Sequence, residues 1–305
     1  MAARMKTLYA HVGLPRCAST LIENLFLIDG AFDKFGINPY RHFIAQGMTP
    51  LTRMYKITRR EAGKVEWGDE IFNLINDYIL TPARRSEMDR FFFSDEALTE
   101  IGETGDAPLI YPSRADFLGR LFEGFDVRVI LVVRQQATYL MSRYGLHLQN
   151  GGRSGLIEYI DCYDTSRLDW LKIANRFADV FGESNIRVVP FEGSLYDDVE
   201  ATDFLDYLQT EMQVADKIGL ASLPLVNPSV PPEYFETQLR VNRGELLPEA
   251  MPDAMTQRQQ RQRDFRFSAA VTDRLMRIQE SFAESNAELF RRYMPEFNAS
   301  HYLKV

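Results

Sequence analysis

The amino-acid sequence predicts an α/β fold with a mostly parallel central β-sheet flanked by helices. Short apolar runs alternate along the chain with longer stretches of helical pattern, and such alternation is typical of parallel strands joined by crossover helices. In addition, the run at 127–133, VRVILVV, is nearly continuous in β-branched residues. A central strand that is covered on both faces has this composition.

A strand, a loop and a helix are predicted in that order near the start of the sequence. Residues 7–12, TLYAHV, form a short apolar run that ends at Gly13 and Pro15, residue types that mark the entry into a loop. From Ser19 onward, the segment STLIENLFLI has apolar residues at helical spacing, with Ser19 or Thr20 available to cap the first turn.

The strand at 127–133 is predicted to lead into a helix that begins at Arg134 and stops near Asn150. Residues 243–267 show no clear periodicity, which favours a loop or a mobile lid. We interpret the whole chain, 1–305, as a single domain. Further strands are expected at 91–94, 109–112 and 186–191, and further helices at 81–90 with Thr81 as cap, at 166–182 and at 268–292.

Composition and charge exclude several classes of protein. The chain of 305 residues has a formal net charge of −8, which argues against non-specific nucleic-acid binding and requires any anion site to be local. Two cysteines, Cys17 and Cys162, are too few for a disulfide scaffold and are consistent with a reducing compartment. No stretch approaches the roughly 20 apolar residues of a membrane span, and no signal peptide is recognisable. We therefore expect a cytoplasmic protein; the sequence does not indicate its oligomeric state.

The loop after the first strand, GLPRCAST, has the features of an anion-binding site. A strand-to-helix turn presents backbone N–H groups and the positive end of the helix dipole to a ligand. Arg16 adds a positive charge, and Ser19 and Thr20 add hydroxyl donors. The alternative is an ordinary turn with an exposed arginine.

An ATP-type phosphate loop is a poor match to the same residues. When the pattern G-x-x-x-x-G-K-[ST] is laid on Gly13 to Thr20, Ala18 occupies the position of the second glycine and Ser19 that of the lysine. Without the lysine, the interpretation as a nucleoside triphosphatase or kinase loses its main support.

The loop resembles the 5′-phosphosulfate-binding loop of sulfotransferases that use 3′-phosphoadenosine-5′-phosphosulfate (PAPS). The resemblance implies an α/β architecture of three layers like that of the P-loop and sulfotransferase folds. Many members carry lysine where this chain has Arg16, and arginine stabilises charge but does not donate a proton at workable pH. The matching residues are Pro15, Arg16, Cys17, Ala18, Ser19 and Thr20.

The junction between the strand at 127–133 and the helix that follows it resembles the same family. Its members hold the 3′-phosphate of the cofactor with an arginine at a strand end and a serine eight residues later, the spacing of Arg134 and Ser142. Arg134 directly follows its strand, which places it at the edge where open α/β sheets bind ligands. Taken alone, the pair could equally be a solvated arginine and a serine on a helix surface. Segments 186–198, 227–243 and 284–293 are similar to bacterial members, whereas a C-terminal Arg-Lys-Gly motif seen in many cytosolic members is absent.

The resemblance implies an enzyme that transfers the sulfuryl group of PAPS to a hydroxyl or amine of a small-molecule, lipid or glycan acceptor, leaving 3′-phosphoadenosine-5′-phosphate. Arg16 would stabilise the leaving phosphate, and Glu96 would accept the acceptor proton; Asp95 is the alternative base, and either could instead cap a helix. His11 is expected to be a hydrogen-bonded structural residue. No metal-ligand spacing is present. A kinase with a degenerate loop and a non-catalytic nucleotide- or glycan-binding protein remain as alternatives.

Overall fold

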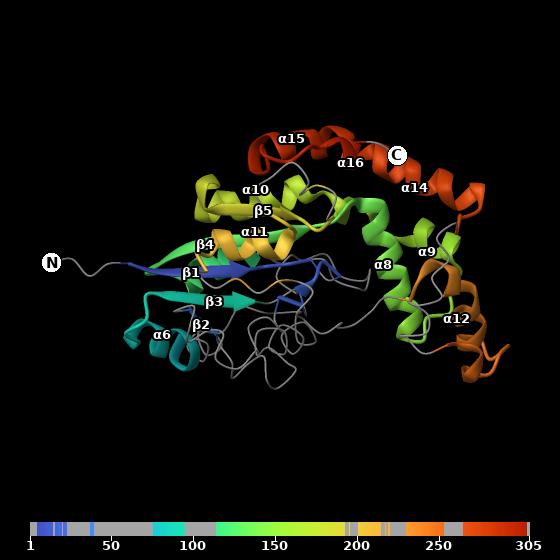
Figure 1. Cartoon of the computed structure of the whole chain (residues 1–305), viewed down its shortest axis with the longest axis horizontal. Helices are drawn as coiled ribbons and strands as arrows, with labels where there is room; N and C mark the ends of the chain where they lie inside the picture. Colours follow the sequence, from blue (N-terminus) through green and yellow to red (C-terminus); the bar gives the residue numbers. More distant parts are fainter. Residues whose placement is uncertain are drawn as a thin grey trace, which may run out of the picture.

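In the computed structural model, five strands of the described residues form one sheet. Neighbouring strands all run parallel, in the order β2-β3-β1-β4-β5 (Figure 1). The predicted α/β class with a parallel sheet is therefore confirmed. The strands are β1 (Lys6–His11), β2 (Ile37–Pro39), β3 (Arg90–Ser94), β4 (Phe125–Val133) and β5 (Ile186–Pro190). The described residues are 5–14, 16–19, 21–22, 37–39, 76–94, 114–192, 195, 201–214, 217, 219, 230–252 and 265–303, so the predicted strand at 109–112 lies outside them.

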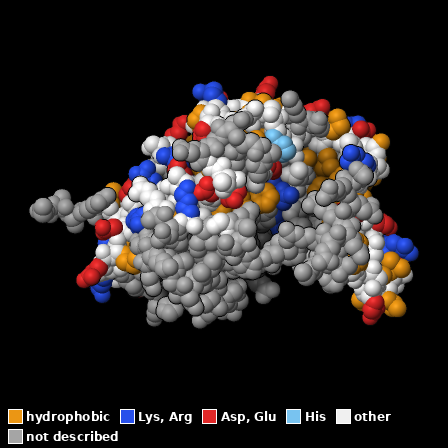
Figure 2. All heavy atoms as spheres, in the orientation of Figure 1, with side chains coloured by type: hydrophobic (Ala, Val, Ile, Leu, Met, Phe, Trp, Pro, Cys, Tyr) orange, Lys and Arg blue, Asp and Glu red, His pale blue; other side chains and the backbone are white. Residues whose placement is uncertain are grey.

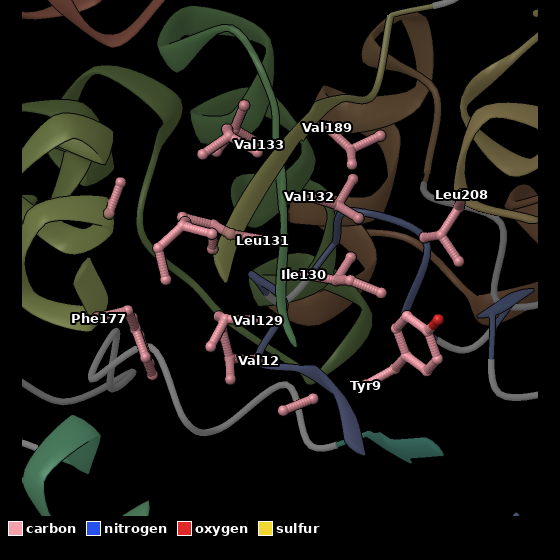
Figure 3. Close-up of a cluster of buried hydrophobic side chains, with 14 of the residues drawn as sticks. Tyr9, Val12, Val129, Ile130, Leu131, Val132, Val133, Phe177, Val189 and Leu208 are labelled. Atoms are coloured by element: carbon pink, nitrogen blue, oxygen red, sulfur yellow. The ribbon is translucent and has the colours of Figure 1, made fainter. Parts of the chain in front are cut away.

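Helices cover both faces of the sheet. In β4 every residue from Val129 to Val133 is buried, and because successive side chains of a strand point to opposite faces, both faces must be covered. Figure 3 shows Leu131 on the side of Phe177, which belongs to α10 (Trp170–Phe181), and Val132 on the side of Leu208, which belongs to α11 (Phe204–Glu211). The result is a three-layer arrangement of helix, sheet and helix.

A second apolar core lies away from the sheet, around α8 (Gln136–Gln149). This long helix leaves the end of β4 and extends toward α9 (Leu156–Cys162) and α12 (Phe235–Asn242) (Figure 1). With α14 (Ala269–Ser281), these helices bury a cluster that includes Tyr144, Ile160, Phe235 and Leu275. The amino-terminal end of α8 thus belongs to the sheet edge and its carboxyl-terminal half to the second core.

The predicted helix at 268–292 is two helices, α14 and α15 (Ala283–Tyr293), which meet at Phe282. The Ser281 hydroxyl donates a hydrogen bond of 2.7 Å to the carbonyl of Ile278, and the Phe282 N–H donates to the carbonyl of Gln279 in a tighter turn. Serine bonds of this kind compete with the helical pattern and bend helices. The apolar spacing continues across the break and therefore did not indicate it.

The region predicted as a helix at 81–90 also differs. The helix α6 (Thr81–Arg85) is preceded by a π-helical turn, Asn76–Leu80, and β3 begins at Arg90. Thr81 therefore continues a helical segment and does not cap it, because the chain is already helical before it. The remaining helical elements are α7 (Arg114–Leu121), α16 (Ser300–Leu303) and short 3-10 turns at Thr165–Leu168, Glu183–Asn185, Pro232–Tyr234 and Pro248–Ala250.

The other helix predictions agree with the structure at their carboxyl ends but not at their starts. Helix α8 begins at Gln136 rather than Arg134, and the segment predicted as one helix at 166–182 is a 3-10 turn followed by α10, which begins at Trp170 because Asp169 caps it. Helix α10 stops at Gly182, which has a positive φ of 86°, and α8 stops at Asn150. Of the segment predicted as a loop or lid, residues 243–252 form turns, and residues 253–264 lie outside the described residues. No helix in the described segments combines the length and apolar character that crossing a membrane requires.

Candidate functional site

The carboxyl ends of β1, β3 and β4 lie at one edge of the sheet. Because the strands are parallel, their carboxyl ends His11, Ser94 and Val133 lie at the same edge, and His11 is paired directly with Ser94. Strand β1 lies between β3 and β4, so the chain crosses over β1 between these two strands. Ligands of open α/β sheets bind at such a switch point, outside the carboxyl ends of the strands.

The loop after β1 has an unusual backbone. Arg16 and Ala18 both have positive φ, 69° and 63°, a conformation that costs of order 1–2 kcal/mol for a residue with a side chain. Between them, the Cys17 N–H donates to the carbonyl of Leu14 at 3.1 Å. Alternation between left-handed and right-handed residues turns successive N–H groups into a concave anion-binding nest, and strain of this kind clusters at ligand sites.

A helix begins directly after this loop. The Ile22 N–H donates to the carbonyl of Ala18 at 2.9 Å, and Ser19, Leu21 and Ile22 have helical conformation. The loop therefore leads into the amino terminus of a helix, as predicted from the sequence. Cys17 and Ser19 are both buried. Pro15 and Thr20 lie outside the described residues, so their roles stay predictions.

The loop contacts the helix that follows β4. Nε of Arg16 donates a hydrogen bond of 3.3 Å to Oγ of Ser142, across 126 residues of sequence. Ser142 is buried and lies six residues into α8, about 9 Å along the helix axis from its start. Two residues that were selected from separate sequence motifs are thus brought into direct contact.

Arg134 is held in place, and its charge has no partner among the described residues. Its Nε donates to Oγ1 of Thr138 at 3.2 Å, its guanidinium carbon lies 4.9 Å from the centroid of the Phe191 ring, and its carbonyl accepts from Nε1 of Trp170 at 2.8 Å. Within the described segments, its two terminal nitrogens make no hydrogen bond and no carboxylate pairs with it. A guanidinium fixed in this way can donate two parallel hydrogen bonds to a phosphate or sulfate group.

Positive charge at this edge is local. Figure 2 shows basic and acidic side chains interspersed over the described part of the visible face. An anion would therefore be attracted by the individual groups at the sheet edge, above all Arg134 and Arg16, rather than by a broad field.

Glu192 is a member of this region that the sequence analysis missed. Its Oε1 accepts from the Gln135 N–H at 2.8 Å, and its Oε2 accepts from the Tyr302 hydroxyl at 2.7 Å. The carboxylate therefore lies beside the amino terminus of α8, where the helix dipole favours negative charge. Its position two residues after the end of β5, the strand beside β4, was the signal that could have placed it at this edge.

The strand that leads to the proposed base ends at Ser94. Asp95 and Glu96 lie outside the described residues, which stop at Ser94 before resuming at Arg114. Ser94 is buried, and its Oγ lies 2.8 Å from Nδ1 of His11. His11 is thus hydrogen-bonded and buried, as predicted for a structural residue, and burial lowers its pKa from 6.5 to about 4. Among the described residues, no group of three or more His, Cys, Asp and Glu side chains could hold a metal ion.

The chain is similar in structure to solved proteins but not detectably similar in sequence to a known family. No protein-family model matches the chain, and no curated protein is detectably similar to it. Among solved structures, the chain is similar to the crystal structure of a sulfotransferase from Alicyclobacillus acidocaldarius, with 15% sequence identity and a TM-score of 0.37. The alignment covers 84% of this chain and 100% of that chain. Because the identity and the TM-score are both low, we infer no function from this likeness.

Proposed function

We propose that this protein is a PAPS-dependent sulfotransferase that transfers a sulfuryl group to a hydroxyl or amine of a small-molecule, lipid or glycan acceptor. The observation that carries this proposal is the hydrogen bond between Arg16 and Ser142. It joins the loop that resembles a 5′-phosphosulfate site to the helix that resembles a 3′-phosphate site. A ligand with anionic groups at both ends can therefore reach the two elements at once.

Each end of the ligand has its own set of groups in this proposal. Arg16 and the N–H groups of the strained loop would bind the 5′-phosphosulfate, with Thr20 as a further donor. Arg134 and Ser142 would bind the 3′-phosphate, and the terminal nitrogens of Arg134 have no other partner among the described residues. The residues present at the sheet edge thus suit a nucleotide that carries an anionic group at each of its two ends.

The chemistry requires charge stabilisation and one proton transfer. When bound, PAPS supplies a sulfuryl group whose bond to the phosphate oxygen breaks as a bond to the acceptor oxygen or nitrogen forms. Arg16 would stabilise the negative charge that develops on the departing phosphate, without donating a proton. Glu96, or Asp95 in its place, would accept the proton that the acceptor loses.

Ligand-induced stabilisation is the first test of this function. We expect 3′-phosphoadenosine-5′-phosphate to raise the midpoint of thermal unfolding more than ATP with magnesium does, because a ligand at 100 times its dissociation constant stabilises by about 2.7 kcal/mol. A preference for ATP with magnesium would reject the proposal in favour of a kinase.

Transfer of labelled sulfate is the second test. With radiolabelled PAPS and a panel of hydroxyl and amine acceptors, we expect labelled product from the wild-type protein and none from Glu96→Ala, which should still bind the nucleotide. Loss of transfer in Asp95→Ala alone would assign the base to the other carboxylate. Nucleotide binding without transfer to any acceptor would favour a non-catalytic binding protein.

A further inference from the structure

His11 is a buried polar residue whose ring lies next to Gly13, the first residue of the candidate phosphate loop. It is the last residue of β1, its side chain is 0% exposed, and its ring stacks on Phe92 of β3 at 6.4 Å between centroids. Nδ1 lies 2.8 Å from Oγ of Ser94, the last residue of β3. One nitrogen of the imidazole therefore ties together the ends of two neighbouring strands at the edge of the sheet where the candidate site lies.

The other ring nitrogen of His11, Nε2, makes no hydrogen bond to the described residues. Nε2 is buried, and no hydrogen-bond partner lies within its reach in the described parts of the chain. Leaving a buried polar group unsatisfied costs about 1–3 kcal/mol, and such groups in folded proteins call for an explanation, which can be catalytic, strain-related or a missing partner. The cost is best explained if Nε2 acquires a partner in another state of the protein.

Nε2 faces the first residue of the loop. A Cβ atom placed on Gly13 would lie 2.5 Å from Nε2 and 2.6 Å from Cε1 of His11, so the imidazole occupies the space that a side chain at position 13 would need. Any change in the path of the loop at Gly13 therefore changes what Nε2 contacts.

The ring is neutral under ordinary conditions. Burial lowers the pKa of His11 to about 4, so near pH 7 one ring nitrogen carries a proton and the other a lone pair. His11 thus attracts no anion by charge and is a weak base. It can still act as one hydrogen-bond donor and one acceptor, whichever nitrogen is protonated.

The loop that follows His11 is strained at Arg16 and Ala18. A strained loop next to a buried group that lacks a hydrogen-bond partner is expected to rearrange when a ligand binds. We propose that His11 is a positioning residue of the phosphate loop: its Nδ1 ties the loop entry to the end of β3, and its Nε2 provides the hydrogen bond that stabilises the loop when an anion is bound. This inference rests on the proposed function, because the anion in question is the 5′-phosphosulfate end of the nucleotide.

Two substitutions separate the two nitrogens. The amide of His11→Asn can replace Nδ1 and keep the bond to Ser94 but cannot reach the position of Nε2, whereas His11→Gln does the reverse. By isothermal titration with 3′-phosphoadenosine-5′-phosphate, we expect His11→Asn to bind about tenfold more weakly than wild type and His11→Gln to bind within about threefold of it. The reverse order, or unchanged affinity in His11→Asn, would overturn the role of Nε2.

A measurement on the wild-type protein keeps the inference testable if either variant fails to fold. In ¹⁵N NMR of histidine side chains, we expect the Nε2 resonance of His11 to shift at saturation with 3′-phosphoadenosine-5′-phosphate; an unchanged resonance would contradict the inference. If the wild-type protein does not bind this nucleotide, the proposed function fails. Inorganic pyrophosphate then probes the loop alone: binding with a shift of the same resonance upholds the role of Nε2, and any other result overturns it.

Discussion

Arg134 is held at two points of its side chain while its charge has no carboxylate partner in the described segments. By contrast, Arg128 pairs with the carboxylate of Asp126 at 3.1 Å. An arginine that is oriented by Thr138 and Phe191 has lost most of its freedom before a ligand arrives. Binding of an anion to it therefore costs little further ordering.

Replacement of Arg134 tests this directly. We expect Arg134→Gln to raise the dissociation constant of 3′-phosphoadenosine-5′-phosphate roughly 10- to 100-fold, since charge-assisted hydrogen bonds contribute about 1.5–3 kcal/mol. Arg128→Gln, which removes a paired arginine from β4, the strand that precedes Arg134, should bind as the wild type does. Equal affinity in the two variants by isothermal titration would remove Arg134 from the site.

The buried imidazole of His11 predicts a dependence of stability on pH. Its pKa is 6.5 in a model peptide and about 4 in the folded protein, so between these values the unfolded chain binds more protons than the folded one. The free energy of unfolding should therefore decrease as the pH is lowered from about 6.5 to 4, with a contribution of about 3 kcal/mol from this residue. Urea unfolding at a series of pH values should show a smaller decrease in His11→Gln; the same decrease would assign the effect to other groups.

At the scale of elements, the contact between β1 and its loop depends on the absence of a side chain at Gly13. A methyl group there would lie 2.5 Å from Nε2 of His11, whereas a methyl group on Gly155, before α9, would meet nothing within 4 Å. The loop entry and the imidazole therefore occupy one tightly packed space.

We expect Gly13→Ala to destabilise the protein by about 1–3 kcal/mol, because the ring or the loop must move to admit the methyl group. It should also weaken binding of 3′-phosphoadenosine-5′-phosphate. Gly155→Ala is the matched control: it should leave binding unchanged and destabilise less than Gly13→Ala, by at most about 1 kcal/mol, because Gly155 is only the N-cap of α9. If chemical denaturation and titration gave the same values for both variants, the loop would be more adaptable at this position than its packing indicates.

At the scale of the whole molecule, residues near position 300 return to the start of α8. A buried network of amides joins Gln136 of α8 to Gln279 of α14 and Asn286 of α15, and both of the latter donate to the carbonyl of Tyr302. The Tyr302 hydroxyl then donates to Glu192. The orientation of α8, and with it of Arg134 and Ser142, thus depends on packing between distant parts of the chain.

Two tyrosines allow this dependence to be measured. Tyr302→Phe removes the 2.7 Å bond to Glu192, and Tyr293→Phe removes a 2.8 Å bond to Asn175 on α10. Each substitution should lower the free energy of unfolding by about 1 kcal/mol. Only Tyr302→Phe should also weaken binding of 3′-phosphoadenosine-5′-phosphate, because Glu192 no longer has its second anchor beside α8. Unchanged affinity in Tyr302→Phe would show that the site tolerates loss of this contact.

Local patterns were sufficient to predict the α/β class and four of the five described strands, and they indicated the two motifs from which the candidate site is proposed. They succeeded because strand burial and loop chemistry are recorded within short windows of sequence. The contact between Arg16 and Ser142, the anchoring of Arg134 by Thr138 and Phe191 and the bond from Tyr302 to Glu192 required the tertiary structure. Each depends on the order of strands in the sheet and on packing between segments more than 50 residues apart, and no local pattern of residues encodes either.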